Sequence, residues 1–148
     1  MLRLQIVTFL LLPLLPSYSD AWRAPLPCAV KINGTANIDF PAGTTFFRFI
    51  ANAKSGGEVT HVYKVCNGKN KKTCGFWMNK NTKKKVASGP TNYNKTKKAL
   101  IIKKIRKTDL GRYESQDGKI VYTVYRLAAG EPGAEDIPKI ADCFNYFG

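Results

Sequence analysis

The chain has 148 residues, the length of one ordinary domain, and a formal net charge of +14 at pH 7. Fifteen of its 24 lysines and arginines lie between Lys64 and Lys107, and no carboxylate occurs between Glu58 and Asp109. A field of one sign over so long a segment attracts polyanions and repels cationic surfaces. This charge pattern excludes a cationic partner for the segment.

The first residues predict a secretory signal peptide. Residues 1–3 carry a positive charge, residues 6–15 are apolar, and residues 17–19 form a small-x-small cleavage site. Pro13 and Pro16 interrupt the apolar run, which is too short to span a bilayer. We therefore expect a secreted, extracellular protein without a transmembrane anchor. The expected division is a signal peptide at residues 1–19, a domain at 20–129 and an acidic tail at 130–148.

The four cysteines predict two disulfides, because an even count is typical of a small secreted domain. Three pairings are open. If Cys66 pairs with Cys74, the bond closes a small polar loop and contributes roughly 2.5 kcal/mol on the chain-entropy estimate. Cys28 and Cys143 would then tie the start of the domain to the tail, for roughly 4–5 kcal/mol. Zinc needs ligand pairs two to four residues apart, so we expect no metal and no other cofactor.

Three strands are predicted before the polar loop, at residues 28–40, 44–51 and 59–66, from their apolar and β-branched residues. In the second strand we expect the odd-numbered residues to face the core and Arg48 to face outward, although Phe46 leaves the opposite register open. The single histidine, His61, is expected to be a packed or surface ring rather than a ligand or base.

Residues 75–79 predict a fourth strand, and its Phe76 and Trp77 fit exposed recognition and sheet packing equally well. The basic residues 80–98 leave room for only a short strand. Asn-x-Thr sequons at Asn33 and Asn94 are candidate glycosylation sites on exposed turns, with an unused site as the alternative because the motif is short and common.

Residues 99–115 carry the most informative pattern. A strand with apolar period two is followed by Asp109, Gly111 and Tyr113 in the order Asp-x-Gly-x-Tyr. This pattern is typical of the E strand, E–F turn and F strand of an immunoglobulin-like β-sandwich, in which the tyrosine hydrogen-bonds to the backbone upstream and pins the corner. Asp109 is expected to accept hydrogen bonds from nearby N–H groups, and Gly111 to allow a tight backbone path.

The expected fold is therefore an all-β, immunoglobulin-like sandwich with a signal peptide and a short C-terminal tail. Residues 28–40 become strands A and A′, 44–51 strand B, 59–66 strand C, 75–79 strand C′, and 119–127 strand G after an Asp117-Gly118 turn. Ser115 stands where the second cysteine of the inter-sheet disulfide is normal, so a phenylalanine of strand B is expected opposite it. The acidic tail could fold over the basic face and mask part of it, a point that the sequence leaves open.

The order of these features resembles the small secreted single-immunoglobulin-domain proteins that are abundant in nematodes. The resemblance is carried by Val-Tyr-Lys-Val-Cys, a second cysteine, Phe-Trp-Met-Asn, and Leu-x-Ile-x-x-Ile-x-x-x-Asp-x-Gly-x-Tyr-x-Ser, and it covers residues 40–127. It implies an extracellular V- or I-set-like domain without the usual B–F disulfide, and little about function. The dense lysines and the pair Cys28 and Cys143 depart from it.

Two functions are carried forward, and neither is enzymatic. The first is a recognition module for an extracellular protein. The second is an effector that binds a glycosaminoglycan or other sulfated glycan, or an anionic membrane surface, with cationic defence as a variant; a merely solvated lysine surface is its alternative. Nucleic acid is not expected as the natural target of a secreted protein. No histidine lies near Ser115 or Asp109 in sequence, so no catalytic residue is predicted. The candidate polyanion-binding residues are Lys69, Lys71, Lys72, Lys83, Lys84, Lys85, Lys95, Lys97, Lys98, Lys103, Lys104, Arg106 and Lys107.

Overall fold

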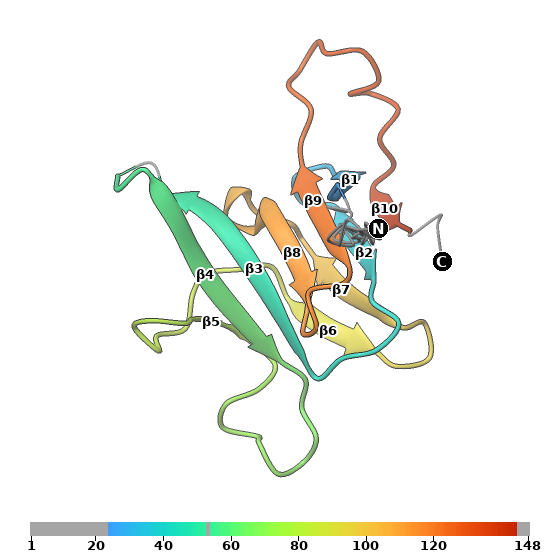
Figure 1. The fold of residues 1–148 in the computed structure, drawn as a ribbon. Helices are drawn as coiled ribbons and strands as arrows, with labels where there is room; N and C mark the ends of the chain where they lie inside the picture. The colour runs from blue at the N-terminus through green and yellow to red at the C-terminus, as the bar shows by residue number, and fades with distance from the viewer. Residues whose placement is uncertain (1–23, 53, 145–148) are drawn as a thin grey trace, which may run out of the picture.

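The computed structural model describes residues 24–52 and 54–144, and this part of the chain is all-β with two mixed sheets, as in a β-sandwich (Figure 1). The predicted signal peptide lies outside the described residues. Within them, no helix is long and apolar enough to cross a membrane. The six-stranded sheet has the order β1 (Leu26–Ala29), β9 (Val121–Tyr125), β8 (Gly111–Ser115), β3 (Thr45–Asn52), β4 (Gly57–Lys64), β5 (Trp77–Asn79). The four-stranded sheet has the order β10 (Ile140–Cys143), β2 (Thr35–Asp39), β7 (Ala99–Lys103), β6 (Thr91–Asn94).

One hydrophobic core joins the two sheets. Buried side chains from β3, β5, β8 and β9 of the first sheet cluster with buried side chains from β2, β7 and β10 of the second. Most strand pairs are antiparallel, but β1 pairs in parallel with β9, and β10 pairs in parallel with β2. The largest members of the core are aromatic: Phe40, Phe46, Trp77, Tyr113 and Tyr122.

The register predicted for residues 44–51 is wrong. Phe46 and Arg48 point into the core and are wholly buried, whereas Phe47 and Phe49 lie on the other side of β3 and are half-buried. An unpaired buried charge is very costly, so an arginine is normally found on the outside. Here Asp109 pairs with Arg48, so the charge is compensated inside the core.

The strand arrangement also differs from the expected one. Residues 28–40 were expected to form the A and A′ edge, but they contain two strands in different sheets, with β2 inside its sheet between β10 and β7. Asn33 and Gly34 form the turn between them; a Cβ on Gly34 would lie 2.7 Å from the Lys139 carbonyl oxygen. The segment expected to be strand B is β3, and it lies in the six-stranded sheet, where it pairs directly with β8; β2 lies in the other sheet. Phe46 is therefore the lateral neighbour of Ser115 in one sheet rather than its partner across the core.

The bend between β7 and β8 has the expected tyrosine contact. The Tyr113 hydroxyl donates to the Asp109 carbonyl oxygen at 2.5 Å, next to the short 3-10 helix η1 (Lys107–Asp109). Gly111 adopts a φ of 155°, and a Cβ there would lie 2.4 Å from the Phe49 carbonyl oxygen. The close approach of β8 to β3 thus requires glycine at this position.

The tail adds a strand instead of covering the basic segment. β10 extends the four-stranded sheet at the edge opposite β6, and Cys143 bonds to Cys28. Among the described residues, the ion pairs include no carboxylate of the tail. The second disulfide joins Cys66 to Cys74, so these are the two pairs considered from the sequence. Figure 1 shows the tail loop before β10 projecting from the end of the sandwich that is opposite to the β4–β5 loop.

Candidate functional site

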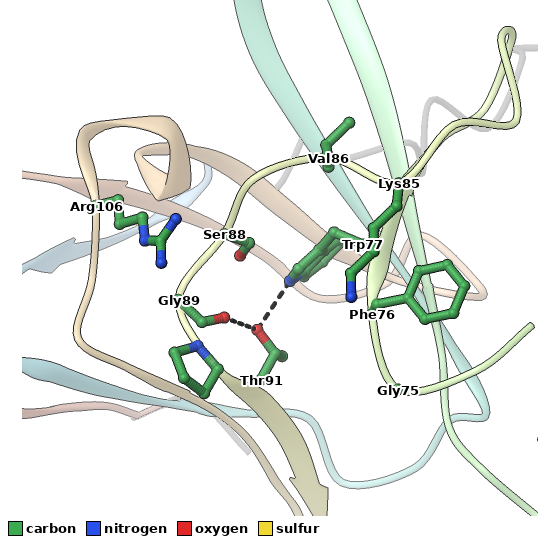
Figure 2. Close-up of a pocket in the computed structure, with 10 residues that line it drawn as sticks. Gly75, Phe76, Trp77, Lys85, Val86, Ser88, Gly89, Thr91 and Arg106 are labelled. Atoms are coloured by element: carbon green, nitrogen blue, oxygen red, sulfur yellow. Dashed lines mark hydrogen bonds between the residues drawn. The ribbon is translucent and has the colours of Figure 1, made fainter.

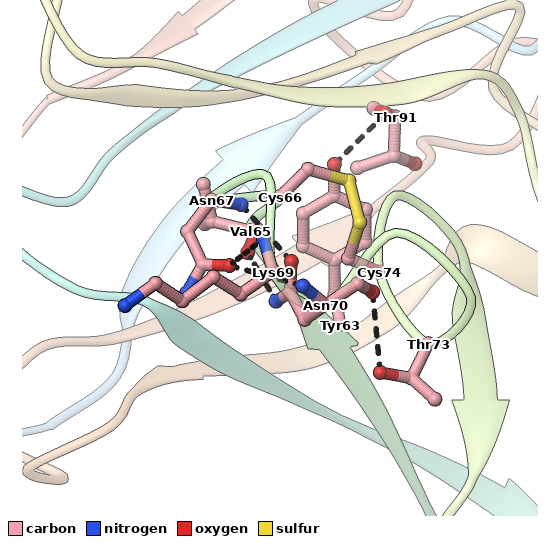
Figure 3. The surroundings of a disulfide bond; sticks show 9 residues. All are labelled: Tyr63, Val65, Cys66, Asn67, Lys69, Asn70, Thr73, Cys74 and Thr91. Atoms are coloured by element: carbon pink, nitrogen blue, oxygen red, sulfur yellow. Dashed lines mark hydrogen bonds between the residues drawn. A yellow bond between two sulfur atoms is a disulfide. The ribbon is translucent and has the colours of Figure 1, made fainter.

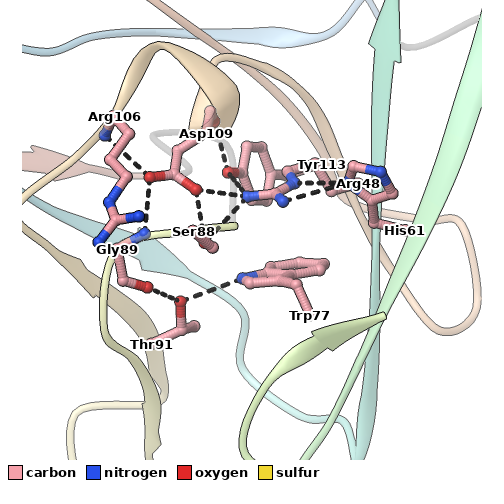
Figure 4. Close-up of polar contacts among 9 residues, drawn as sticks. All are labelled: Arg48, His61, Trp77, Ser88, Gly89, Thr91, Arg106, Asp109 and Tyr113. Atoms are coloured by element: carbon pink, nitrogen blue, oxygen red, sulfur yellow. Dashed lines mark hydrogen bonds and ion pairs between the residues drawn. The ribbon is translucent and has the colours of Figure 1, made fainter. Parts of the chain in front are cut away.

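A buried ion pair joins β3 to the bend before β8 (Figure 4). Arg48 Nη1 donates to Asp109 Oδ1 at 2.6 Å, and both side chains are shielded from solvent. A buried pair is favourable only when its remaining hydrogen-bonding groups are also satisfied. Nε and Nη2 of Arg48 lie 3.3 and 3.1 Å from His61 Nδ1, which completes one side of the guanidinium.

His61 is a neutral acceptor in this network. Burial, reinforced by the positive charge of Arg48 and opposed by Asp109, lowers the pKa of His61 from 6.5 to about 4. The unprotonated Nδ1 can then accept from the guanidinium. Of the packed or surface ring expected from the sequence, the structure shows a partly buried, packed one, and the contact with Arg48 was not predicted.

Trp77 packs against the guanidinium of Arg48. The Arg48 guanidinium lies over the indole, 4.5 Å from its centre, and the Trp77 and Tyr113 rings meet edge to face. The indole Nε1–H donates to Thr91 Oγ1 at 3.0 Å, and the Thr91 hydroxyl donates to the Gly89 carbonyl. The sequence left two roles open for Trp77, exposed recognition and sheet packing. Trp77 is buried, so its role is sheet packing. Phe76 remains partly exposed.

The Asp109 carboxylate also fixes two loops. Oδ2 accepts the backbone N–H groups of Gly89 and Arg106 at 2.9 and 2.8 Å. Oδ1 accepts the Ser88 hydroxyl at 2.5 Å in addition to the arginine. One carboxylate therefore holds the segment before β6 against the segment before η1. This confirms the prediction that Asp109 accepts hydrogen bonds from backbone N–H groups.

A pocket of about 170 Å³ opens beside this network, between residues 75–77 and 85–91 (Figure 2). We call it the edge pocket, because β5 and β6 are the edge strands of their two sheets. Phe76 and Trp77 form its aromatic wall, in which only the Phe76 ring is partly exposed, and Lys85 and Arg106 supply its positive charge. Figure 2 shows Arg106 on one side of Trp77, and Lys85 with Phe76 on the other.

The outward side of the six-stranded sheet is a second candidate surface. Phe47 and Phe49 are half-buried there; Lys80 lies 5.7 Å from the centre of the Phe47 ring, and the Arg112 guanidinium lies 4.5 Å from that of Phe49. Arg112 also pairs with Glu58 at 3.2 Å and with Glu114 at 3.3 Å. Register places further residues on the same side. We define the outer sheet face as Phe47, Phe49, Thr60, Val62, Met78, Arg112 and Glu114.

The basic candidates are all exposed, but they do not form one face. Lys69, Lys71 and Lys72 lie in the β4–β5 loop, and Lys95, Lys97 and Lys98 in the β6–β7 turn. Figure 1 shows both connections at the lower end of the sandwich and the β7–β8 connection, with Lys104, Arg106 and Lys107, at the upper end. Lys83, Lys84 and Lys85 precede β6, and Lys103 ends β7. Lys85 and Arg106 are the candidates that share a pocket.

The Cys66–Cys74 disulfide closes an ordered loop (Figure 3). Asn67 Oδ1 accepts the backbone N–H groups of Lys69 and Asn70, and Asn70 Nδ2 donates to the Val65 carbonyl oxygen at 2.9 Å. The loop therefore presents its lysines from a constrained backbone. In the described residues no group of three or more His, Cys, Asp or Glu side chains is arranged to hold a metal ion.

The two sequons differ in setting. Asn33 is exposed in a turn, with a positive φ of 64°. Asn94 ends β6 and is half-buried, and its Oδ1 accepts the backbone N–H groups of Thr96 and Lys97. Asn33 is thus the more accessible acceptor for a glycan.

No protein-family model, curated protein or solved structure matches the chain.

Proposed function

We propose that the protein is a secreted, non-enzymatic immunoglobulin-like recognition module, of the kind found in the nematode single-domain proteins that its sequence resembles. The strand order supports this proposal. β9-β8-β3-β4-β5 corresponds to G-F-C-C′-C″ of a variable-type domain, and β2-β7-β6 corresponds to B-E-D. The bond from Tyr113 to the Asp109 backbone is the corner contact of that fold. Immunoglobulin-like sandwiches commonly serve as rigid frames for recognition, which is an argument from analogy.

The outer sheet face carries the proposal. Phe47 and Phe49 are aromatic, only half-buried and flanked by arginine and lysine, whereas the other side of the same strand is fully packed. Aromatic residues and arginine are enriched at protein interfaces, where they supply most of the binding energy. The face is therefore suited to docking against an extracellular protein.

Affinity capture tests this function. The immobilised mature protein is exposed to extracellular extracts, alongside Phe49→Ser and, as a matched control, Phe144→Ser, which removes an exposed phenylalanine beside β10. We expect a partner that is retained by the wild type and by Phe144→Ser and is lost with Phe49→Ser. A partner retained equally by all three proteins would show that the outer sheet face is not the recognition surface.

Polyanion binding is the second candidate function. It is favoured by the exposure of every candidate lysine together with the absence of carboxylates between Glu58 and Asp109 in the sequence. Lysines on such a surface give affinity without fine geometry, and the affinity falls steeply with salt. We expect retention on heparin well above physiological salt. Unchanged elution after Lys83, Lys84, Lys85, Lys97 and Lys98 are replaced by glutamine would contradict this function.

A further inference from the structure

We propose that the edge pocket binds one acidic sugar unit of a sulfated glycan, with the ring against Phe76 and the sulfate or carboxylate bound by Lys85 and Arg106. This inference rests on the second candidate function and gives it a defined site. It goes beyond the outer sheet face, because the pocket lies at the edge between the two sheets.

Two basic segments converge on this pocket. Lys85 ends the lysine run that precedes β6, and Arg106 belongs to the basic segment that follows β7. Strands β6 and β7 separate them in sequence, yet both side chains line the same cavity. Charge that is diffuse elsewhere on the surface is therefore concentrated at one concave position, where it acts on a ligand at short range.

The polar groups of the pocket select an anion. The ammonium of Lys85 and the guanidinium of Arg106 can only donate hydrogen bonds. The Asp109 carboxylate beside the pocket is turned to the protein, since it accepts from Arg48, Ser88 and two backbone N–H groups. A ligand with several acceptor oxygens and negative charge satisfies these donors, and a cation does not.

The aromatic wall indicates more than a free inorganic anion. The partly exposed Phe76 ring offers apolar area against which the C–H face of a sugar ring can pack, beside the cations that bind its acidic group. At about 170 Å³ the pocket is smaller than the roughly 300–1,000 Å³ that encloses a whole drug-sized ligand. It therefore suits a single ring of a longer chain, whose neighbouring units would lie over Lys83, Lys84, Lys103 and Lys104.

The walls are held in place before any ligand binds. The Asp109 carboxylate fixes the backbone of Gly89 and Arg106. Trp77 is held between the Arg48 guanidinium above its ring and Thr91 at its Nε1–H. The Lys85 ammonium already lies 5.2 Å from the centre of the Phe76 ring. Preorganisation of this kind lowers the entropic cost of binding.

Calorimetry with a sulfated heparin disaccharide tests the inference. The pocket variants are Lys85→Gln and Arg106→Gln, and the matched controls are Lys71→Gln and Lys97→Gln, which remove the same charge from exposed positions outside the pocket. We expect each pocket variant to weaken binding by about tenfold or more, since each loses a charge-assisted contact. The controls should change it by less than about twofold, and the unsulfated disaccharide, which keeps only its carboxylate, should bind more weakly.

A third pocket variant, Phe76→Ser, keeps the charge and removes part of the aromatic wall. It should also weaken binding of the disaccharide while leaving heparin elution nearly unchanged. Unfolding midpoints are measured for every variant, so that a loss of fold is distinguished from a loss of the site.

The outcomes separate the pocket from the wider function. Equal losses in pocket and control variants would overturn the pocket and leave diffuse polyanion binding in place. Strong retention on heparin without any binding of the disaccharide would do the same. If the wild type neither stays on heparin nor binds the disaccharide, the second candidate function fails and the pocket fails with it. Binding to phosphatidylserine vesicles that is insensitive to Lys85→Gln and Arg106→Gln, without disaccharide binding, would overturn the pocket in favour of a membrane surface.

Discussion

Arg48 and Asp109 form an ion pair of 2.6 Å in the core, although they lie on β3 and in the bend before β8. The pair links the middle of one strand to the corner that the Tyr113 hydroxyl pins. It also fixes the backbone at Gly89 and Arg106, which line the edge pocket. The interior of the domain and its candidate site are therefore built on the same carboxylate.

Arg48→Met should strongly destabilise the protein. It keeps apolar volume but leaves the Asp109 carboxylate buried without its charge partner, a change that costs about 3–5 kcal/mol. The free energy of unfolding is measured by urea titration with the disulfides intact. The matched control is Arg112→Met on the half-exposed ion pair with Glu58, for which a loss of about 0–1 kcal/mol is expected. Similar losses in the two variants would show that the buried pair has no special role.

Tyr113→Phe and Tyr122→Phe should behave differently, although the two tyrosines are buried and pair in register. Tyr113→Phe removes the bond to the Asp109 carbonyl and should cost about 1–3 kcal/mol. Among the described residues the Tyr122 hydroxyl has no hydrogen-bond partner, so Tyr122→Phe should be neutral or stabilising. Thermal unfolding of both variants checks this. A larger loss for Tyr122→Phe would contradict the assigned corner contact.

Stability should fall as the pH drops from 6.5 towards 4. The folded-state pKa of His61 is about 4, below the value of 6.5 expected in the unfolded chain. Between these values the unfolded state binds more protons than the folded state, so the free energy of unfolding rises with pH. The contribution of His61 reaches its full value above pH 6.5. His61→Gln retains an acceptor for Arg48 and should flatten this part of the profile. Unfolding midpoints from pH 7 to pH 4 provide the measurement, and an unchanged slope in His61→Gln would assign the dependence to other groups.

The two disulfides should differ in their contribution to stability. The Cys28–Cys143 bond closes a separation of 115 residues, against 8 for Cys66–Cys74. The chain-entropy estimate gives about 4–5 kcal/mol for the long loop and about 2.5 kcal/mol for the short one. Guanidinium unfolding of the two double alanine variants compares them. Equal losses, or a larger loss for the short loop, would indicate that native contacts rather than loop length determine the difference.

The pattern of residues 99–115 was enough to predict the bend, because its strand, turn and tyrosine are contiguous in sequence. The register of β3 was not predictable in the same way. Phe46 and Phe47 are equally apolar, and only the position of Arg48 could decide between the two sides. The charge of Arg48 favours an outward-facing side chain. Its partner Asp109 lies on a distant segment, and the ion pair between them allows Arg48 to lie in the core.

The edge pocket depends on contacts that sequence spacing does not contain. Lys85 and Arg106 line one pocket because β6 and β7 pair as an antiparallel hairpin, which brings the segment after β7 back beside the segment before β6. The strand arrangement of residues 28–40 was mispredicted for a similar reason. No local signal in these residues shows that β1 and β2 belong to different sheets. In contrast, exposure of the lysines followed directly from composition.

The most direct measurement for the central claim, that two basic segments meet over Trp77 to form one anion site, is a nitrogen–proton NMR titration with the sulfated disaccharide. The account predicts that the largest shifts occur at the Trp77 indole N–H and at the backbone amides of Gly89 and Arg106. Shifts confined to the β4–β5 loop and the β6–β7 turn, with an unchanged Trp77 indole signal, would contradict it.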